Sequence, residues 1–155
     1  MKRAIALALV LFSIPARAQT VASLRVNSDT STYLAKVETD PSVGYRLVIE
    51  CVEACSNSTT YREDVGDVPM GLFVRDQDDL LFSLWGGGSV YRVRVWKITD
   101  AGISRIIEIS SRDRPQFLDD PRGHPIIHTF EAQSGSGPRS LIRWNYDGKR
   151  FVRRR

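Results

Sequence analysis

Two cysteines have the spacing that most directly suggests a chemical role. Cys51 and Cys55 are the only cysteines in the chain, and three residues separate them. A dithiol redox motif has two intervening residues, and a zinc site needs histidines or further cysteines nearby, so neither chemistry fits. On a continuous strand the two Cα atoms would lie about 13 Å apart, beyond the roughly 7 Å that a disulfide spans. We therefore expect a disulfide whose cysteines form a cross-strand pair around a three-residue loop at 52–54.

The only two histidines, His124 and His128, have the i, i+4 spacing of zinc ligands on a helix. Pro125 and the β-branched residues that follow it predict a strand instead, on which the two histidines lie about 13 Å apart. Both nitrogens cannot then be about 2.1 Å from one zinc ion. We predict no metal site and no cofactor, with both histidines structural and partly exposed.

No group of residues predicts catalysis. No serine lies in a G-x-S-x-G motif, and the glycine run at 86–88 lacks the lysine and the Ser/Thr of a phosphate-binding loop. The acidic pairs Asp78-Asp79 and Asp119-Asp120 are adjacent residues, whose side chains point to opposite faces of a strand. Turn capping explains these pairs better than acid–base chemistry. We expect no catalytic residue and a protein that is not an enzyme, with a hydrolase as a distant alternative.

Arginine and tryptophan side chains form a candidate binding face. Arg92, Arg94 and Trp96 alternate on one face of a predicted strand, and Arg143 lies beside Trp144 in a later one. Basic groups beside aromatic rings can bind an anionic polymer through charge and stacking. The alternative is a solvated face on which the arginine stems cover the sheet.

The N-terminus has the pattern of a cleavable secretion signal. Lys2 and Arg3 precede an apolar run at residues 4–14, and Ala16-Arg17-Ala18 places a small residue at each position that a signal peptidase recognises. The run is too short for a membrane span, which takes roughly 20 residues. We expect cleavage near Ala18 and a periplasmic or extracellular protein that is not an integral membrane protein. Disulfides persist in such compartments.

The charge of the chain is divided between its two halves. The formal net charge is +4, but without residues 1–18 the chain has 19 basic and 18 acidic residues, a net charge of +1. Such a nearly neutral protein is not expected to bind nucleic acid. Residues 19–88 carry a net charge of −6 and residues 89–155 one of +7. The asymmetry can mark a binding face, but we favour neutralisation between the two ends of one domain.

Apolar and polar residues alternate through most of the chain after residue 20, which is typical of strands rather than helices. Glycine, proline and aspartate separate these runs, for example at 40–41, 66–69, 86–88, 100–102 and 147–148. The 137 residues from 19 to 155 suit one domain. We predict a small all-β domain of mostly antiparallel strands, arranged as a sandwich, a barrel or propeller-blade-like hairpins.

The C-terminal half contains an internal similarity. Residues 80–107 align with 125–152 so that Trp96 and Trp144 coincide at an offset of 48 residues. This predicts a two-unit repeat at about 80–111 and 112–155. A period of about 40 to 50 residues with several strands per unit is typical of propeller blades.

The segment from Trp144 to Val152, with the sequence WNYDGKRFV, resembles the hairpin that closes blades in FG-GAP or VCBS-type β-propeller repeats. Residues 117–126 are similar in position to the calcium-binding loop of that family. Only Asp119 and Asp120 remain there as carboxylates, whereas calcium takes six to eight oxygen ligands, so the loop is degenerate. Two blades cannot close a propeller of four or more. The resemblance thus implies blade-like hairpins that close differently or assemble.

These observations favour an exported, non-enzymatic β domain that acts by binding in the cell envelope. Its partner would be an envelope protein or an anionic glycan. The alternative is an inhibitor-like or structural domain of the periplasm, stapled by the disulfide. The sequence leaves the ligand and the oligomeric state open.

Overall fold

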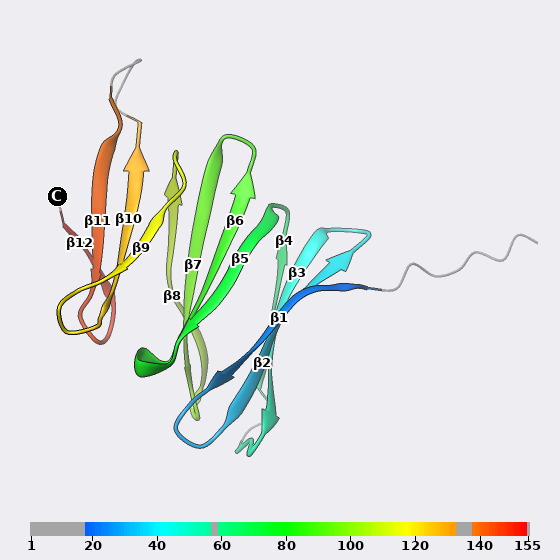
Figure 1. Ribbon diagram of the computed structural model, residues 1–155. Helices are drawn as coiled ribbons and strands as arrows, with labels where there is room; N and C mark the ends of the chain where they lie inside the picture. Colours follow the sequence, from blue (N-terminus) through cyan, green and yellow to red (C-terminus); the bar gives the residue numbers. More distant parts are fainter. Residues whose placement is uncertain (1–17, 57–58, 133–137, 155) are drawn as a thin grey trace, which may run out of the picture.

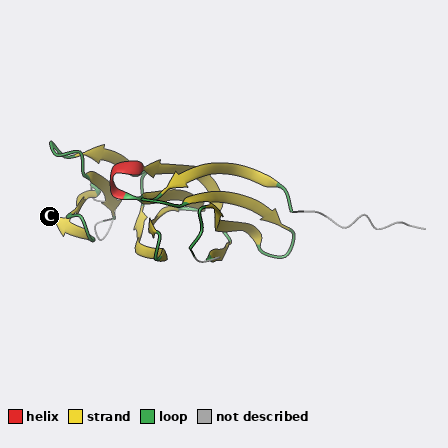
Figure 2. Cartoon of the chain, turned by 90° about the horizontal axis from the view of Figure 1, so that it is seen from below, coloured by secondary structure: helices red, strands yellow, loops and turns green. Residues whose placement is uncertain are grey.

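The computed structural model describes residues 18–56, 59–132 and 138–154, so the predicted secretion signal lies outside this part except for Ala18. Within these ranges the chain is built almost wholly from strands, with one short helical turn, η1 (Asp76–Asp78), drawn red in Figure 2. The predicted all-β class is confirmed. No helix in the described part is long and apolar enough to cross a membrane.

The described residues form twelve strands in three four-stranded sheets, each an antiparallel meander in which the strand order follows the sequence. The first sheet contains β1 (Thr20–Asn27), β2 (Thr32–Asp40), β3 (Gly44–Glu53) and β4 (Thr60–Val65). The second contains β5 (Val68–Arg75), β6 (Leu80–Gly87), β7 (Val90–Thr99) and β8 (Gly102–Ser111). The third contains β9 (Gln116–Asp119), β10 (Pro125–Glu131), β11 (Ser140–Tyr146) and β12 (Phe151–Arg154).

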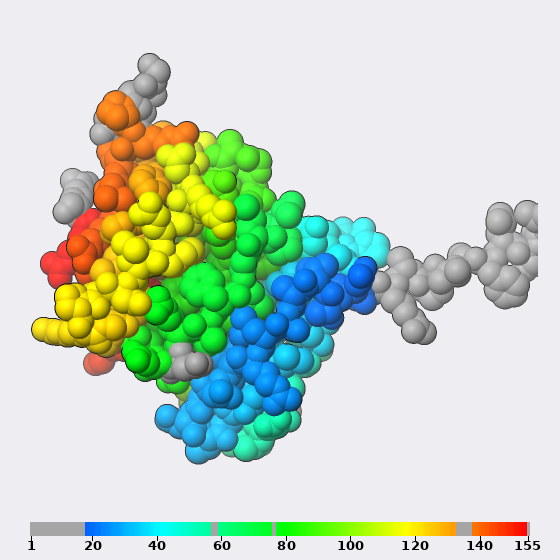
Figure 3. Space-filling model, in the orientation of Figure 1, coloured from blue at the N-terminus to red at the C-terminus, as the bar shows by residue number. Residues whose placement is uncertain are grey.

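The three sheets lie face to face in sequence order, from the first sheet on the right of Figure 1 to the third on the left. The space-filling view shows them as adjoining layers of one body (Figure 3). The segments aligned from the sequence occupy equivalent places: β6 and β10 are the second strands of their sheets, and β7 and β11 the third. Trp96 and Trp144 each face the preceding sheet. The first sheet has the same strand order, which the sequence alignment does not indicate.

One hydrophobic core lies between the first and second sheets. The first sheet contributes the inward side chains of β1 to β4, among them Tyr33, Leu47 and Ile49, which are at most 2% exposed. From the second sheet come Leu81 and Trp85 of β6 with Trp96 and Ile98 of β7. The alternation predicted for these strands thus marks a buried face.

A second core lies between the second and third sheets. Leu80, Phe82 and Leu84 of β6 pack there with Ile127 of β10 and Phe151 of β12. The second sheet is therefore covered on both faces. This explains why β6 reads as a nearly continuous apolar run, since a strand buried on both sides needs no polar face.

Phe82 connects the two sheets that form the second core. Its ring centroid lies 4.9 Å from that of Phe73, 6.0 Å from that of Phe117 and 6.2 Å from that of Phe151. Phe73 belongs to the second sheet, whereas Phe117 and Phe151 belong to the third.

We predict that Phe82→Ala lowers the free energy of unfolding by about 3–5 kcal/mol, because it opens a cavity in this aromatic cluster. Urea unfolding followed by tryptophan fluorescence measures the change. Leu141→Ala is the control, because Leu141 is 51% exposed and its truncation opens no cavity. Equal effects of the two substitutions would contradict the assignment of this core.

Cys51 and Cys55 form a disulfide, with a Cα–Cα distance of 5.8 Å. The pairing was predicted, but its setting differs from the prediction. β3 continues to Glu53, and the returning strand β4 starts at Thr60, which pairs with Glu50. The disulfide therefore closes a turn at the end of β3 rather than linking a cross-strand pair. Ala54 makes this turn with a φ of 53°.

We expect the double substitution Cys51→Ser/Cys55→Ser to lower the free energy of unfolding by at most about 2 kcal/mol, because so short a loop restricts the unfolded chain little. Chemical denaturation measures the loss, and far-ultraviolet circular dichroism should stay unchanged. Thiol titration of the wild-type protein, denatured without reductant, should find no free thiol. Two free thiols there would contradict the bond.

Candidate functional site

The structure does not bring the five residues of the predicted binding face together. Arg92, Arg94 and Trp96 all lie on the face of β7 that is turned toward the first sheet. Trp96 is fully buried. Its ring packs edge-on against that of Tyr61, with the two ring centroids 6.0 Å apart. Arg94 is only 8% exposed. The sequence could not show this burial, because the covering sheet is some 30 residues away in the chain.

The two arginines of β7 are engaged in ion pairs. Arg92 lies 2.7 Å from Asp67, and Arg94 lies 3.2 Å from Glu108 and 3.8 Å from Glu63. Glu63 also accepts a hydrogen bond of 2.6 Å from Arg105. Asp67 and Glu63, from the N-terminal half, thus pair with basic residues of the C-terminal half. This is the arrangement that we favoured for the charge asymmetry.

Arg143 and Trp144 point to opposite faces of β11, as neighbours on a strand must. Arg143 is exposed on the outer face of the third sheet, where its Nε donates to Asn145 at 2.9 Å. Trp144 faces the second sheet, and its indole N–H donates to the hydroxyl of Thr129 at 3.0 Å. Of the five predicted residues, Trp144 lines a cavity between the second and third sheets.

This cavity, which we call the groove, has a volume of about 430 Å³. It lies between the second and third sheets at the ends of β8 and β10, whose arrowheads point to the top of Figure 1. Its walls include Trp144, Phe130, Arg112, Glu131 and Arg153. The guanidinium of Arg153 lies 5.9 Å from the centroid of the Trp144 ring. The groove therefore combines the Trp144 ring with charged side chains from both sheets, Arg112 beside the second and Glu131 and Arg153 in the third.

A second hollow of about 400 Å³ adjoins the groove. Both are lined by Val90 and Arg112, and the second also by Tyr91 and Met70. The backbone of Arg112 is fixed, because its N–H donates to the carbonyl of Phe130 at 2.8 Å. Arg112 thus stands on the boundary between the two hollows, on a backbone that links both sheets.

The charged groups of the groove differ in their partners. Arg153 pairs with Glu131 at 2.9 Å. Arg112 is exposed and donates to the hydroxyl of Ser89 at 3.4 Å, and within the described residues it forms no ion pair with a carboxylate. Sequence reasoning missed Arg112, since it follows a strand without any motif and only the packing of two sheets brings it near Trp144.

The two histidines lie on different parts of the third sheet. His124 precedes β10, and its Nδ1 is 3.3 Å from a carboxylate oxygen of Asp78. His128 is in the middle of β10, on the outer face, with Gln116 and Arg143 as its cross-strand neighbours. The strand that was predicted to separate them is present.

The loop that resembles a calcium site is a capped turn. One carboxylate oxygen of Asp120 accepts the backbone N–H groups of Arg122 at 2.8 Å and His124 at 2.9 Å. These bonds lower the pKa of Asp120. Asp119 instead pairs with Arg75 of β5 at 2.7 Å. The described residues contain no group of three or more acidic, histidine or cysteine side chains that could hold a metal ion.

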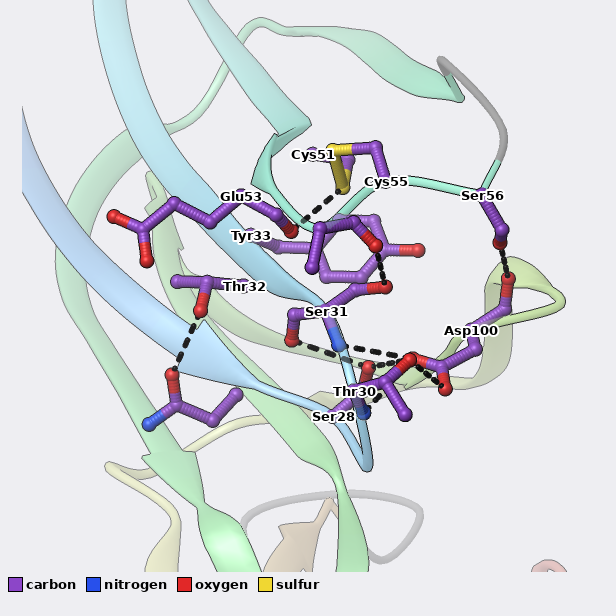
Figure 4. The surroundings of a disulfide bond; sticks show 12 residues. Ser28, Thr30, Ser31, Thr32, Tyr33, Cys51, Glu53, Cys55, Ser56 and Asp100 are labelled. Carbon is purple, nitrogen blue, oxygen red and sulfur yellow. Dashed lines mark hydrogen bonds between the residues drawn. A yellow bond between two sulfur atoms is a disulfide. The ribbon is translucent and has the colours of Figure 1, made fainter.

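Asp100, in the turn between β7 and β8, holds the first sheet against the second (Figure 4). Its carboxylate accepts hydrogen bonds from the hydroxyls of Ser28 at 2.5 Å and Thr30 at 2.6 Å, and from the backbone N–H of Ser31 at 3.2 Å. The hydroxyl bonds hold the pKa of Asp100 well below its ordinary value. Nearby, the hydroxyl of Tyr33 donates to the carbonyl of Thr99 at 3.0 Å.

We expect Asp100→Asn to lower the midpoint of thermal unfolding by a few degrees at pH 7, because the ionised carboxylate accepts these bonds. The pKa of Asp100 is lower in the folded state than the value of about 3.9 in an unfolded chain. Its stabilisation is therefore complete well above pH 4 and is lost as the pH falls below it.

Calorimetry between pH 2 and pH 7 tests this, with Asp29→Asn in the β1–β2 turn as the control for loss of one charge. The midpoints of the wild type and Asp100→Asn should converge below about pH 4. A gap between them that stays constant over the whole range would contradict the proposed role.

Comparison of the chain with protein-family profiles, with curated proteins and with solved structures finds no match.

Proposed function

We propose that this chain is an exported, non-enzymatic binding domain of the cell envelope, and that the groove is its ligand site. The observation that carries the proposal is the position of Trp144 and Arg112 on facing walls of the same cavity. The secretion pattern at residues 1–18 and the disulfide support export, since disulfides persist outside the cytoplasm.

Binding fits the polar groups of the described residues better than catalysis does. A serine hydrolase of the triad type would need a histidine beside both a serine and a carboxylate. His128 has Gln116 and Arg143 as its neighbours across the sheet, which supply neither. Asp119 and Asp120, the adjacent carboxylates of the third sheet, are used in an ion pair and a turn cap.

The groove is also held rigidly, which favours binding because little freedom is lost when a ligand enters. Its two walls are joined by the bond from the Arg112 N–H to the Phe130 carbonyl. A second bond of 2.9 Å runs from the Phe130 N–H to the hydroxyl of Ser111. The indole of Trp144 is fixed by its bond to Thr129.

The three tryptophans provide a test within one spectrum. Trp85 and Trp96 are buried between the first and second sheets, whereas Trp144 lines the groove. We predict that soluble oligosaccharides, tested as a panel of neutral and acidic chains, include one that shifts the indole N–H resonance of Trp144 saturably. The resonances of Trp85 and Trp96 should not move.

Nitrogen–proton correlation spectra of the purified protein measure these shifts. Lack of any shift across the whole panel, or equal shifts of all three indoles, would contradict the groove as the ligand site. The alternative of a structural domain stapled by Cys51 and Cys55 would then be the better account.

A further inference from the structure

We infer that the groove selects an acidic oligosaccharide, with one sugar ring packed against Trp144 and a ring carboxylate bound by Arg112. This inference rests on the proposed function and specifies its ligand class. It assigns the charge recognition to Arg112, outside the face predicted from the sequence.

Trp144 is suited to a sugar ring rather than to a hydrogen-bonding ligand. Its N–H, the only polar group of the indole, already donates to Thr129. What remains for the groove is apolar ring surface, next to the polar groups of Arg153 and Glu131. A sugar ring has an apolar C–H face bordered by hydroxyls, so it can pack on the indole while its hydroxyls reach those two side chains.

The charge of the groove points to a ligand with few anionic groups. Glu131 neutralises Arg153, which leaves Arg112 as the excess positive charge of this cavity. A guanidinium can bind a carboxylate with two parallel hydrogen bonds. Arg112 is exposed, and among the described residues its side chain makes only the long contact to Ser89.

The two hollows set the length of the ligand. Volumes of about 430 and 400 Å³ each fall within the range of about 300–1,000 Å³ for small-molecule sites. They meet at Arg112, with Trp144 in one and the half-buried ring of Tyr91 in the other. A chain of two or more sugars can therefore extend through both hollows, with a carboxylate at Arg112 between them.

Isothermal titration calorimetry with digalacturonate, a disaccharide with two carboxylates, as the probe tests the inference. Arg112→Gln should weaken binding by about 10- to 100-fold, the range expected for loss of a charge-assisted hydrogen bond. The matched control is Arg143→Gln, which removes an exposed arginine on the opposite face of β11 that pairs with no carboxylate among the described residues. It should change the affinity less than twofold. Arg112→Lys should fall between Arg112→Gln and the wild type, because it keeps the charge but not the paired donors.

The methyl ester of the same oligosaccharide isolates the role of charge, since it keeps the rings and masks the carboxylates. Wild-type protein should bind the ester as weakly as Arg112→Gln binds the free acid, and Arg112→Gln should not weaken ester binding further. The control for folding is thermal unfolding, in which the midpoint temperature of Arg112→Gln should stay close to that of the wild type.

Three results would overturn the inference in distinguishable ways. If the ester binds as tightly as the acid and still shifts the Trp144 indole resonance, the groove remains the ligand site but does not select for charge. If neither compound binds and the neutral members of the panel leave Trp144 unchanged, the inference and the proposed function both fail. Equal weakening by Arg112→Gln and Arg143→Gln would also overturn the inference, because it would indicate a diffuse charge effect.

Discussion

The structure depends on the burial of the second sheet on both of its faces. Leu81 and Trp85 of β6 pack toward the first sheet, while Phe82 and Leu84 pack toward the third. A strand with this pattern has apolar side chains on both faces, so the second sheet is stable only when another sheet covers each of them. The outer sheets can instead keep one solvated face. On the first sheet, Lys36 pairs there with Glu38 and Glu50.

Polar contacts then set how the sheets sit on one another. Apolar packing is not directional, whereas hydrogen bonds and ion pairs have a fixed geometry. Asp100 binds the β1–β2 turn of the first sheet, and Glu63 of β4 pairs with Arg105 of β8. On the other side, Arg75 of β5 pairs with Asp119 of β9. Because these contacts join neighbouring sheets, they are structural.

The groove arises where two packed sheets end. Backbone and side-chain hydrogen bonds join the second and third sheets at the ends of β8 and β10, and side chains there line an open cavity rather than a closed core. Trp144 belongs to the inner face of its sheet and is the aromatic ring at that margin. Arg112 directly follows β8 at the same margin, and it forms no ion pair with a carboxylate among the described residues. The proposed ligand site thus consists of side chains at the edge of the two packed sheets.

The sequence by itself determined the all-β class, the alternation in strands such as β2, the pairing of Cys51 with Cys55 and the turn role of Asp120, because these depend on neighbours within a few residues. Only the tertiary structure decided which strand faces are buried. Arg94 and Trp96 alternate like an exposed face, but the first sheet covers them. Likewise, Arg112 approaches Trp144 only because the second and third sheets pack together. Alternation shows that a strand has two faces, and long-range packing determines what covers each.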